Sequence, residues 1–381
     1  MWTTPALSQL EAAISSPPNP IGMRMRAAYF LRQEYENYVK NNDDSEGEIC
    51  KNVIDFLGMG LQNKEHGSLM RHEFAYVLGQ LRDERACAVL EKILSDKTDN
   101  TMVRHECAEA LGAIGALSSL PILQSIQQQS KSTQNEEISQ TCEIAIDYMT
   151  WKNSSKSKEE EEYDGVACAC MLSPYSSHDP APPHPTHVHL STEELGDILR
   201  CEEKPLFERY RAMFSLRNRG TTECVHELGN TLVQDSSSAL LRHEIAYVLG
   251  QMAHDASVES LSESLRRKGE HEMVRHESAE ALGAIEGRWE DVERILREFS
   301  DDEDVVVKES CLVALDAADY WGYGGAHEEE EEEKKQVDDG ENNNAEDGPL
   351  SFVQQKAVTN GKRMEDGEKK DVIRNHFNVV V

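Results

Sequence analysis

The chain has 381 residues, of which 38% are hydrophobic, and this is enough to form two or three packed domains. The net charge of −32 argues against a nucleic-acid-binding protein, because phosphates need Lys and Arg partners, and it favours cationic partners instead. No stretch of about 18 apolar residues occurs, so the sequence predicts no membrane span.

Cysteine usage and the N-terminal sequence indicate where the protein resides. The nine cysteines form no C-x-x-C pair, and several occupy apolar positions of helical patterns. This usage predicts reduced thiols and a cytoplasmic protein. Residues 1–13 lack the basic start and the long apolar run of a signal peptide, so we expect no secretion signal. We also expect the chain to be a monomer.

Helical periodicity runs through most of the chain, with apolar residues three or four positions apart. In the first half this spacing predicts helices over residues 7–15, 21–34, 48–60, 68–82, 84–96, 101–115, 117–129 and 136–150. In the second half it predicts helices over residues 192–201, 205–218, 221–233, 238–252, 256–268, 272–285, 288–299 and 303–320. Each half therefore contains four predicted helix pairs, and neither half has a convincing strand pattern.

Three segments depart from the helical pattern. The polar residues 36–49 predict a surface loop inserted after the first helix pair. An acidic run and a stretch rich in Pro and His within residues 152–190 predict an extended linker, whose histidines we interpret as solvated. The acidic residues from 326 onward predict a disordered tail. The expected division is an N-terminal half (1–151), a linker (152–190), a C-terminal half (191–325) and a tail (326–381).

One short motif, Arg-His-Glu, occurs four times, at residues 71–73, 104–106, 242–244 and 275–277. Residues 71–80 match 242–251 at nine of ten positions, and residues 102–114 match 273–285 at twelve of thirteen. Within each half the two motifs lie 33 residues apart, and each lies 171 residues from its twin in the other half. Because 33 residues is the length of one helix-turn-helix repeat, the sequence predicts a duplicated solenoid.

Helical geometry places the histidine of each motif away from the core. At about 100° per residue, an apolar stripe forms on one face of the first motif helix, made of Met70, Phe74, Val77, Leu78 and Leu81. His72 falls opposite this stripe, and His105, His243 and His276 occupy the same position in their own helices. Small residues follow each histidine on its own face, among them Gly79, Gly112, Gly250 and Gly283. We interpret these small residues as leaving room for something to approach.

Four histidines and four glutamates without a thiolate suit iron, manganese or zinc. Since neighbouring repeats stack about 10 Å apart, His72 and His105 are expected to bind one ion together with one of the two glutamates. The second half would build the same site, and facing halves would form one two-metal centre. The residues themselves leave open which glutamates bind metal. A Glu in a first helical turn beside an exposed His also needs no functional explanation.

The chain closely resembles the deoxyhypusine hydroxylase family. The resemblance lies in the four motifs, in the AEALGAI and AYVLGQ sequences that follow them, and in RYRAMFSLRN at 209–218. The resemblance covers about residues 5–320. It implies an all-α, HEAT-like solenoid of eight helix pairs, in two pseudo-symmetric halves of four that face each other across a metal site. It also implies a monooxygenase with a non-haem di-iron centre, using two Fe(II) ions per chain and O2. The implied substrate is the deoxyhypusine side chain of translation initiation factor five-A, which becomes hypusine.

The resemblance also implies roles for individual residues. It implies one iron bound by His72, His105 and Glu106, and a second iron bound by His243, His276 and Glu277. Glu73 and Glu244 would bind the cationic amines of deoxyhypusine without being primary ligands. Met102 and Met273 would either line the pocket or pack in the core. The alternatives are a non-catalytic HEAT-repeat binding scaffold, a bilin lyase-like protein, and a two-zinc hydrolase.

Overall fold

The computed structural model describes residues 6–42, 47–133, 135–155, 157 and 173–321. The N-terminal half contains helices α1 (Leu7–Ser15), α2 (Ile21–Asn42), α3 (Glu48–Gln62), α4 (Gly67–Leu81), α5 (Cys87–Ser95), α6 (Thr101–Ile114), α7 (Leu120–Thr133) and α8 (Glu136–Lys152). The C-terminal half contains α10 (Thr192–Arg200), α11 (Leu206–Arg219), α12 (Thr222–Gln234), α13 (Ala239–Met252), α14 (Val258–Arg266), α15 (Glu272–Gly283), α16 (Trp289–Phe299) and α17 (Val305–Trp321). Short 3-10 turns span Lys64–His66, Glu84–Ala86, Leu117–Ser119, Pro185–His189, Asp255–Ser257 and Glu286–Arg288. The predicted tail lies outside the described residues.

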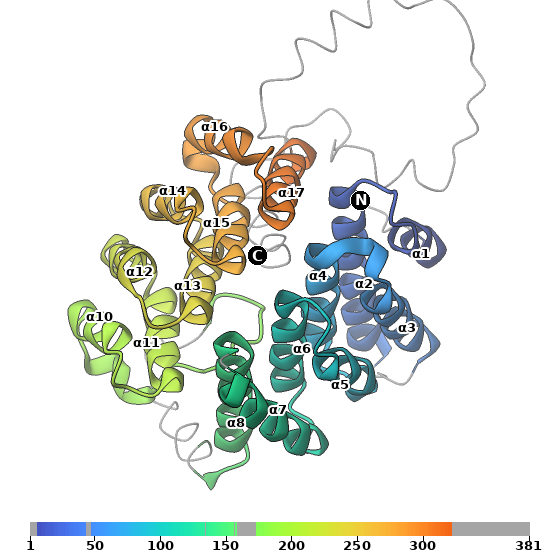
Figure 1. The fold of residues 1–381 in the computed structure, drawn as a ribbon, viewed down its shortest axis with the longest axis horizontal. Coiled ribbons are helices and arrows are strands. Elements are labelled where there is room, and N and C mark those ends of the chain that lie inside the picture. The colour runs from blue at the N-terminus through green and yellow to red at the C-terminus, as the bar shows by residue number, and fades with distance from the viewer. Residues whose placement is uncertain (1–5, 43–46, 134, 156, 158–172, 322–381) are drawn as a thin grey trace, which may run out of the picture.

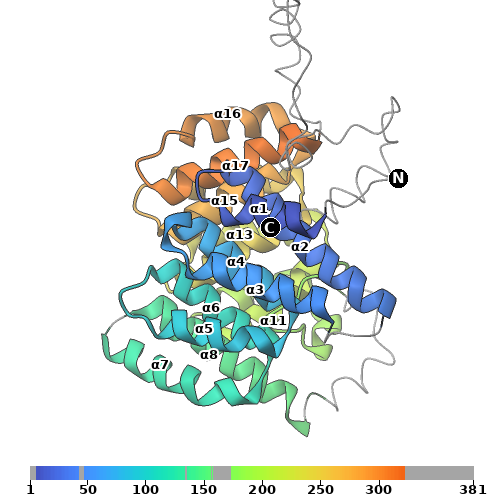
Figure 2. The same cartoon turned by 90° about the vertical axis from the view of Figure 1, so that its right-hand side faces the viewer.

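The described helices form an all-α solenoid whose two halves face each other (Figure 1). One helix of each pair lies on the outside, and its partner lies on the inside, the inner helices being α2, α4, α6, α8, α11, α13, α15 and α17. A view from the side shows the pairs of one half stacked in successive layers (Figure 2). Among the described helices, none is both long enough and apolar enough to cross a membrane. The predicted fold is therefore confirmed.

The two halves contact each other at both ends, which closes the solenoid into a ring. At one end α8 packs against α11 and α13, and at the other end α17 packs against α2 and α4. The guanidinium of Arg26 on α2 forms an ion pair with Asp316 on α17, and it lies 4.5 Å from the centre of the Tyr320 ring. Closure of the ring directs the inner helices of both halves toward one central space (Figure 1).

The core consists of two apolar clusters, each formed largely by one half. The stripe predicted on α4 is buried, with Met70, Phe74 and Val77 fully inaccessible to solvent. Met102 and Met273 belong to these clusters and are also fully buried. Of the two interpretations of these methionines, core packing is therefore the correct one.

The arginine of the repeated motif fastens one helix pair to the next. Arg71 Nε donates to the carbonyl oxygen of Leu61 at 2.7 Å, which satisfies the carboxyl end of α3. Its two terminal nitrogens each lie 2.7 Å from an oxygen of Asp99, ahead of α6. Arg104 and Arg275 make the same contact to a carbonyl ten residues upstream, at 3.0 and 2.9 Å. Arg275 also reaches Asp302 ahead of α17, and Arg242 reaches Glu270 ahead of α15, so three of the four motif arginines connect one helix pair to the next.

The small residues behind three of the four histidines allow a neighbouring helix to approach, so helix packing uses the room that the sequence predicted there. A Cβ atom on Gly79 would lie 2.7 Å from Ala110 Cα, and one on Gly112 would lie 2.9 Å from Ala145 Cβ. A Cβ atom on Gly283 would lie 2.7 Å from the corresponding Ala314 Cβ. The absent side chains therefore allow α4, α6, α8, α15 and α17 to approach their neighbours closely, which brings adjacent motif histidines together.

The polar insertion after the first helix pair is not simply a loop, as the sequence had indicated. Helix α2 continues to Asn42, so residues 36–42 are helical, and residues 43–46 lie outside the described part. The extension is held by Tyr35, whose hydroxyl donates to Asp83 Oδ2 at 2.9 Å, and by the ion pair of Arg32 with Glu36 at 2.7 Å. The long-range hydrogen bond of Tyr35 and the local ion pair of Arg32 together outweigh the low apolar content of the segment.

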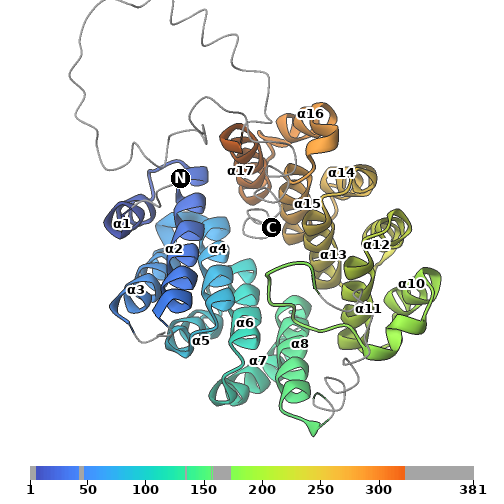
Figure 3. The same cartoon turned by 180° about the vertical axis from the view of Figure 1, so that it is seen from behind.

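The Pro/His-rich segment is also not a solvated linker throughout. Ala181 is fully buried, and His187 is 8% exposed and hydrogen-bonded through Nδ1 to Ser215 Oγ at 2.7 Å. Arg217 Nη1 donates to Asp179 Oδ1 at 2.7 Å. Residues 173–190 therefore pack on the C-terminal half and run through the centre of the ring (Figure 3). Buried arginines on α11, which the local composition does not reveal, order this segment.

Candidate metal centre

Four inner helices, α4, α6, α13 and α15, each contribute one motif histidine to the same place. The ring centres of His72 and His105 lie 5.3 Å apart, and those of His243 and His276 lie 5.5 Å apart. Across the halves, His72 lies 5.3 Å from His276 and His105 lies 5.2 Å from His243. The predicted convergence of four imidazoles from both halves is confirmed, whereas their role as ligands stays a prediction.

The glutamates of the motifs extend the cluster with approximate twofold symmetry. His72 Nε2 lies 3.2 Å from Glu106 Oε2, and His243 Nε2 lies 3.3 Å from Glu277 Oε2. Glu73 instead approaches the other nitrogen of its neighbouring imidazole, His72 Nδ1, at 2.9 Å. Glu106 and Glu277 therefore face the space between the histidines, and the division of ligands that the resemblance implied stays a prediction.

Two groups of donors are close enough to share an ion, with all ligand atoms of a group within 4.8 Å of one another. The first group is His72, His105 and Glu106, the set expected for one iron. The second group is His72, His243 and His276. It contains His72, from the opposite half, in place of the expected Glu277. Glu277 nevertheless lies 3.8 Å from His276 Nε2. The donors therefore form one compact cluster rather than two separate sites.

The hydrogen bonding of the imidazoles fits metal ligation. His105 and His276 are fully buried, and His72 and His243 are 4% exposed. Both ring nitrogens of His105, His243 and His276, and Nε2 of His72, are buried and have no hydrogen-bond partner among the described residues. An unsatisfied buried polar atom costs roughly 1–3 kcal/mol, so seven such nitrogens in one place would be strongly destabilising on their own. Coordination of metal ions would satisfy several of these nitrogens together.

Burial and neighbouring charges tune the protonation of the imidazoles. Burial, His243 and His72 lower the pKa of His105 well below its ordinary value. Burial, His72 and His243 do the same to the pKa of His276. Burial also acts to lower the pKa of His72, but the Glu106 and Glu73 carboxylates outweigh it and raise that pKa. His105 and His276 are therefore neutral at pH 7, which is the form that binds a metal.

Carboxylates surround the histidines in unusual number. Five buried glutamates line or adjoin the cluster, namely Glu73, Glu106, Glu244, Glu277 and Glu280. Within the described residues, every ion pair that these carboxylates make is with a histidine of the cluster. Burial together with Glu109 and Glu277 raises the pKa of Glu244 well above its ordinary value. Such a site has excess negative charge, and cations would stabilise it.

Several residues of the centre were not recognised from the sequence. Glu109 lines the cavity beside Glu106, and burial with that neighbour raises its pKa to about 8. Glu280 Oε1 lies 3.6 Å from His276 Nδ1. The hydroxyls of Tyr76 and Tyr247 meet across the halves at 3.1 Å. A signal was present, because each of these residues follows a motif histidine by four positions and so shares its helix face.

The fold and the site define a helical-repeat protein with a buried His/Glu cluster whose donor atoms could hold a metal ion. A family model for HEAT repeats matches residues 54–137 and 227–316. The chain is 42% identical over 298 residues to deoxyhypusine hydroxylase of Candida albicans, covering 78% of this chain and 86% of that protein. It is 44% identical over 256 residues to deoxyhypusine hydroxylase of Drosophila melanogaster, covering 67% of this chain and 78% of that protein.

A solved structure agrees with these relatives. The structure of human deoxyhypusine hydroxylase in complex with glycerol superimposes with a TM-score of 0.68 at 37% identity, covering 82% of this chain and 96% of that chain. The chain therefore belongs to the deoxyhypusine hydroxylase family.

Proposed function

We propose that this protein hydroxylates the deoxyhypusine side chain of translation initiation factor five-A to form hypusine. The observation that carries the proposal is the convergence of four motif imidazoles from both halves within a buried, carboxylate-rich cavity. Membership of the family supplies the reaction class, and the unsatisfied ring nitrogens support a metal-dependent enzyme.

Two metal ions would be held by the residues that the motif repeats in each half. We assign one ion to His72, His105 and Glu106, and the other to His243, His276 and Glu277. Ferrous ions at these positions would let O2 insert one oxygen atom into an unactivated C–H bond, while two electrons and two protons reduce the other atom to water. Imidazole and carboxylate donors without thiolate suit this metal.

The protein itself would bind and orient the substrate. Deoxyhypusine carries two amines, and a cationic amine is stabilised by buried carboxylates through charge-assisted hydrogen bonds. We assign this role to Glu73 and Glu244, which lie in the cavity beside the histidines. The Tyr29 hydroxyl donates to Glu73 Oε2 at 2.5 Å and so fixes that carboxylate. Such contacts would hold the reacting carbon near the metals, and burial would exclude bulk water.

The decisive experiment incubates purified, iron-loaded protein with the deoxyhypusine form of the factor under air, followed by amino-acid analysis. We expect hypusine to appear, and its absence from protein with two bound irons would contradict the proposal. Metal analysis of the protein as purified, before any iron is added, separates the other possibilities. Zinc in place of iron would favour a hydrolase, and protein without metal would favour a binding scaffold.

Cellular location and oligomeric state stay predictions. The described cysteines are free, and Cys50, Cys107, Cys142 and Cys224 are buried, which suits the cytoplasmic location that we propose. A single chain already contributes the histidines of both halves of the centre, so the proposed reaction does not need a second copy of the chain.

A further inference from the structure

One of the four motif arginines lacks the carboxylate partner that the others have. Arg71, Arg242 and Arg275 each form an ion pair with an acidic residue ahead of the next inner helix. Arg104 Nε donates to the Leu94 carbonyl oxygen at 3.0 Å. The two terminal nitrogens of Arg104 have no hydrogen-bond or ion-pair partner within the described residues, although Arg104 is only 7% exposed. A buried guanidinium without a counterion is costly, so an anion would stabilise this position.

The loop ahead of α8 explains the missing partner. The loops ahead of α6, α15 and α17 each contain the acidic residue that the preceding motif arginine binds. Residues 130–135, ahead of α8, read SKSTQN and contain no carboxylate. The acidic residues just before α6 are already engaged, because Asp96 is paired with Lys64 at 3.2 Å and Asp99 is the partner of Arg71. Neither is therefore available to the next motif arginine.

Arg104 lines a cavity of about 410 Å³, a size typical of small-molecule sites. The lining comes from the end of α5, from α6, from α7 and from the residue that precedes α8. Although the chain carries a net charge of −32, none of the described residues that line this cavity is acidic, and Lys97 contributes a second cation. The cavity is therefore locally positive in an acidic protein, which suits an anionic ligand.

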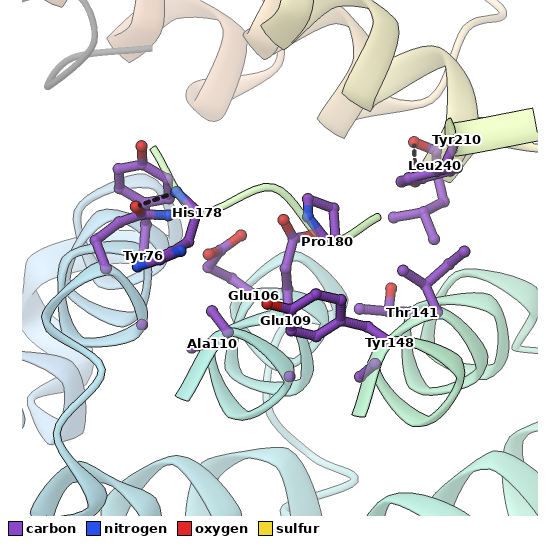
Figure 4. A pocket seen from close by; sticks show the side chains of 16 residues that line it. Tyr76, Glu106, Glu109, Ala110, Thr141, Tyr148, His178, Pro180, Tyr210 and Leu240 are labelled. Carbon is purple, nitrogen blue, oxygen red and sulfur yellow. Dashed lines mark hydrogen bonds between the residues drawn. The ribbon is translucent and has the colours of Figure 1, made fainter. Parts of the chain in front are cut away.

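This cavity is separate from the metal centre, because it lies on the other side of α6. Figure 4 shows Glu106 and Glu109 directed from α6 toward Pro180, and both glutamates border the space around the histidines. At about 100° per residue, Arg104 lies roughly 140–160° around the helix from these two glutamates. None of the motif histidines or motif glutamates lines the Arg104 cavity. An anion bound there would therefore not take part in metal ligation.

Uncharged hydrogen-bond donors line the cavity together with the two cations. Ser130 is buried, and its hydroxyl makes no hydrogen bond to any described residue. The Ser125 hydroxyl accepts from Gln129 Nε2 at 3.0 Å, which leaves its own hydrogen available. Asn135 Oδ1 accepts from the Ile138 backbone N–H at 3.1 Å, so its side-chain NH2 group remains available to a ligand. The cavity therefore offers more donors than the guanidinium alone provides.

We propose that Arg104, Lys97, Ser130 and Asn135 form a binding site for a phosphate group, either the free ion or a small phosphate ester. The two terminal nitrogens of the guanidinium suit two oxygens of an oxyanion. A carboxylate has only those two oxygens, whereas a phosphate group has further oxygens for the ammonium, hydroxyl and amide donors. The bound anion would supply the negative charge that an acidic side chain supplies to the other motif arginines. This site is independent of the proposed hydroxylation.

The test measures binding of inorganic phosphate to the full-length, iron-loaded chain by calorimetry at constant ionic strength. Asn135→Asp places a carboxylate in the cavity and removes the available NH2 group, yet α8 stays capped, since Asp and Asn are equally good N-caps. We expect this variant to bind phosphate about tenfold more weakly or worse. Thr221→Asp is the matched control, because it adds the same charge at the exposed start of α12 and should change the phosphate affinity less than about twofold. Equal phosphate affinities of the wild type and Asn135→Asp, as binding at the iron would give, or equal losses in both variants would overturn the proposal.

A second variant covers the case in which a change at the start of α8 disturbs folding. Lys97 is exposed, so Lys97→Glu should leave the packing intact and weaken phosphate binding about threefold or more. Unchanged phosphate binding by Lys97→Glu would contradict the proposal. Glycerol 3-phosphate and acetate are titrated in parallel, and the tighter ligand of glycerol 3-phosphate and inorganic phosphate identifies an ester or a free ion as the source. Acetate that binds as tightly as either phosphate would overturn the assignment to a phosphate group.

Discussion

Replacing Gly79 by alanine tests whether the small residue behind His72 is needed for the close packing of α4 on α6. The added Cβ would lie 2.7 Å from Ala110 Cα and 2.8 Å from Ala110 Cβ. Since the contacted atoms belong to the backbone of α6 and its first side-chain carbon, relief requires the two helices to separate. Overpacking of this kind costs roughly 3 kcal/mol at its upper range, and alanine recovers about 1 kcal/mol through its helix propensity.

The net effect expected for Gly79→Ala is a loss of about 2 kcal/mol in the free energy of unfolding, from the difference of these two contributions. For a protein of this size that corresponds to a fall of roughly 4 °C in the unfolding midpoint. Separation of α4 from α6 also moves His72 away from His105, so we expect less bound iron per folded chain. Urea unfolding and metal analysis of the purified variant measure the two effects.

Gly58 provides the matched control, because a Cβ there meets only Val89 Cγ1, at the ordinary contact distance of 3.6 Å. Gly58→Ala should be neutral or should stabilise the protein by up to about 1 kcal/mol, and it should keep the iron content of the wild type. Equal stability and equal iron content of Gly79→Ala and Gly58→Ala would refute this role of Gly79. In that case the packing of α4 on α6 would not depend on the absence of a side chain there.

Three further perturbations follow from the contacts described. Arg71→Met leaves the Asp99 carboxylate buried without its bidentate partner. The free energy of unfolding, measured in urea, should therefore fall by about 3 kcal/mol or more. A fall below about 1 kcal/mol would disprove the stacking role of the motif arginine. Tyr29→Phe removes the hydroxyl that donates to Glu73. Steady-state kinetics should show a roughly tenfold fall in kcat/KM, with the amount of bound iron unchanged. Unaltered kinetics would show that this hydrogen bond does not contribute to catalysis. Burial, His184 and Arg211 lower the pKa of His187 to about 4, so the unfolded chain binds a proton that the folded chain excludes as the pH falls from about 6.5 to 4. Stability should therefore decline over that range, and His187→Asn should lose about 2 kcal/mol less than the wild type between pH 6.5 and 4.5; parallel pH profiles of the two proteins would contradict the assignment.

Much of the fold followed from the sequence because helix pairs are encoded locally. The apolar stripe of Met70, Phe74 and Val77 identified the buried face of α4, and the 33-residue spacing identified the repeat. The four histidines could be placed together because duplication puts them in equivalent positions. Their convergence depends on ring closure through α2 and α17, and the motif spacing is compatible with that closure.

The features that were missed depend on tertiary contacts. Local composition suggested that residues 36–49 form a loop, but Tyr35 bonds to Asp83 and α2 continues to Asn42. His187 was expected in solvent, and Arg211 and Ser215 of α11 instead hold its segment against the C-terminal half.

The roles of Gly79, Glu109 and Glu280 could not be predicted from the sequence for a different reason. The sequence does not show what lies beside Gly79. The short distance from an added Cβ on Gly79 to Ala110 shows that a neighbouring helix lies there. Glu109 and Glu280 have nearly identical sequence contexts, yet among the described residues only Glu280 forms a hydrogen bond. The difference arises from hydroxyl groups on other helices, which a repeat pattern cannot reveal.

Anomalous diffraction at the iron absorption edge, from crystals of the iron-loaded protein, tests directly whether the motif histidines of both halves bind two iron ions. We expect two iron peaks between α4 and α6 on one side and α13 and α15 on the other. One iron should be bonded to His72 and His105, and the other to His243 and His276. Iron peaks elsewhere, or a centre formed by the histidines of one half alone, would contradict it.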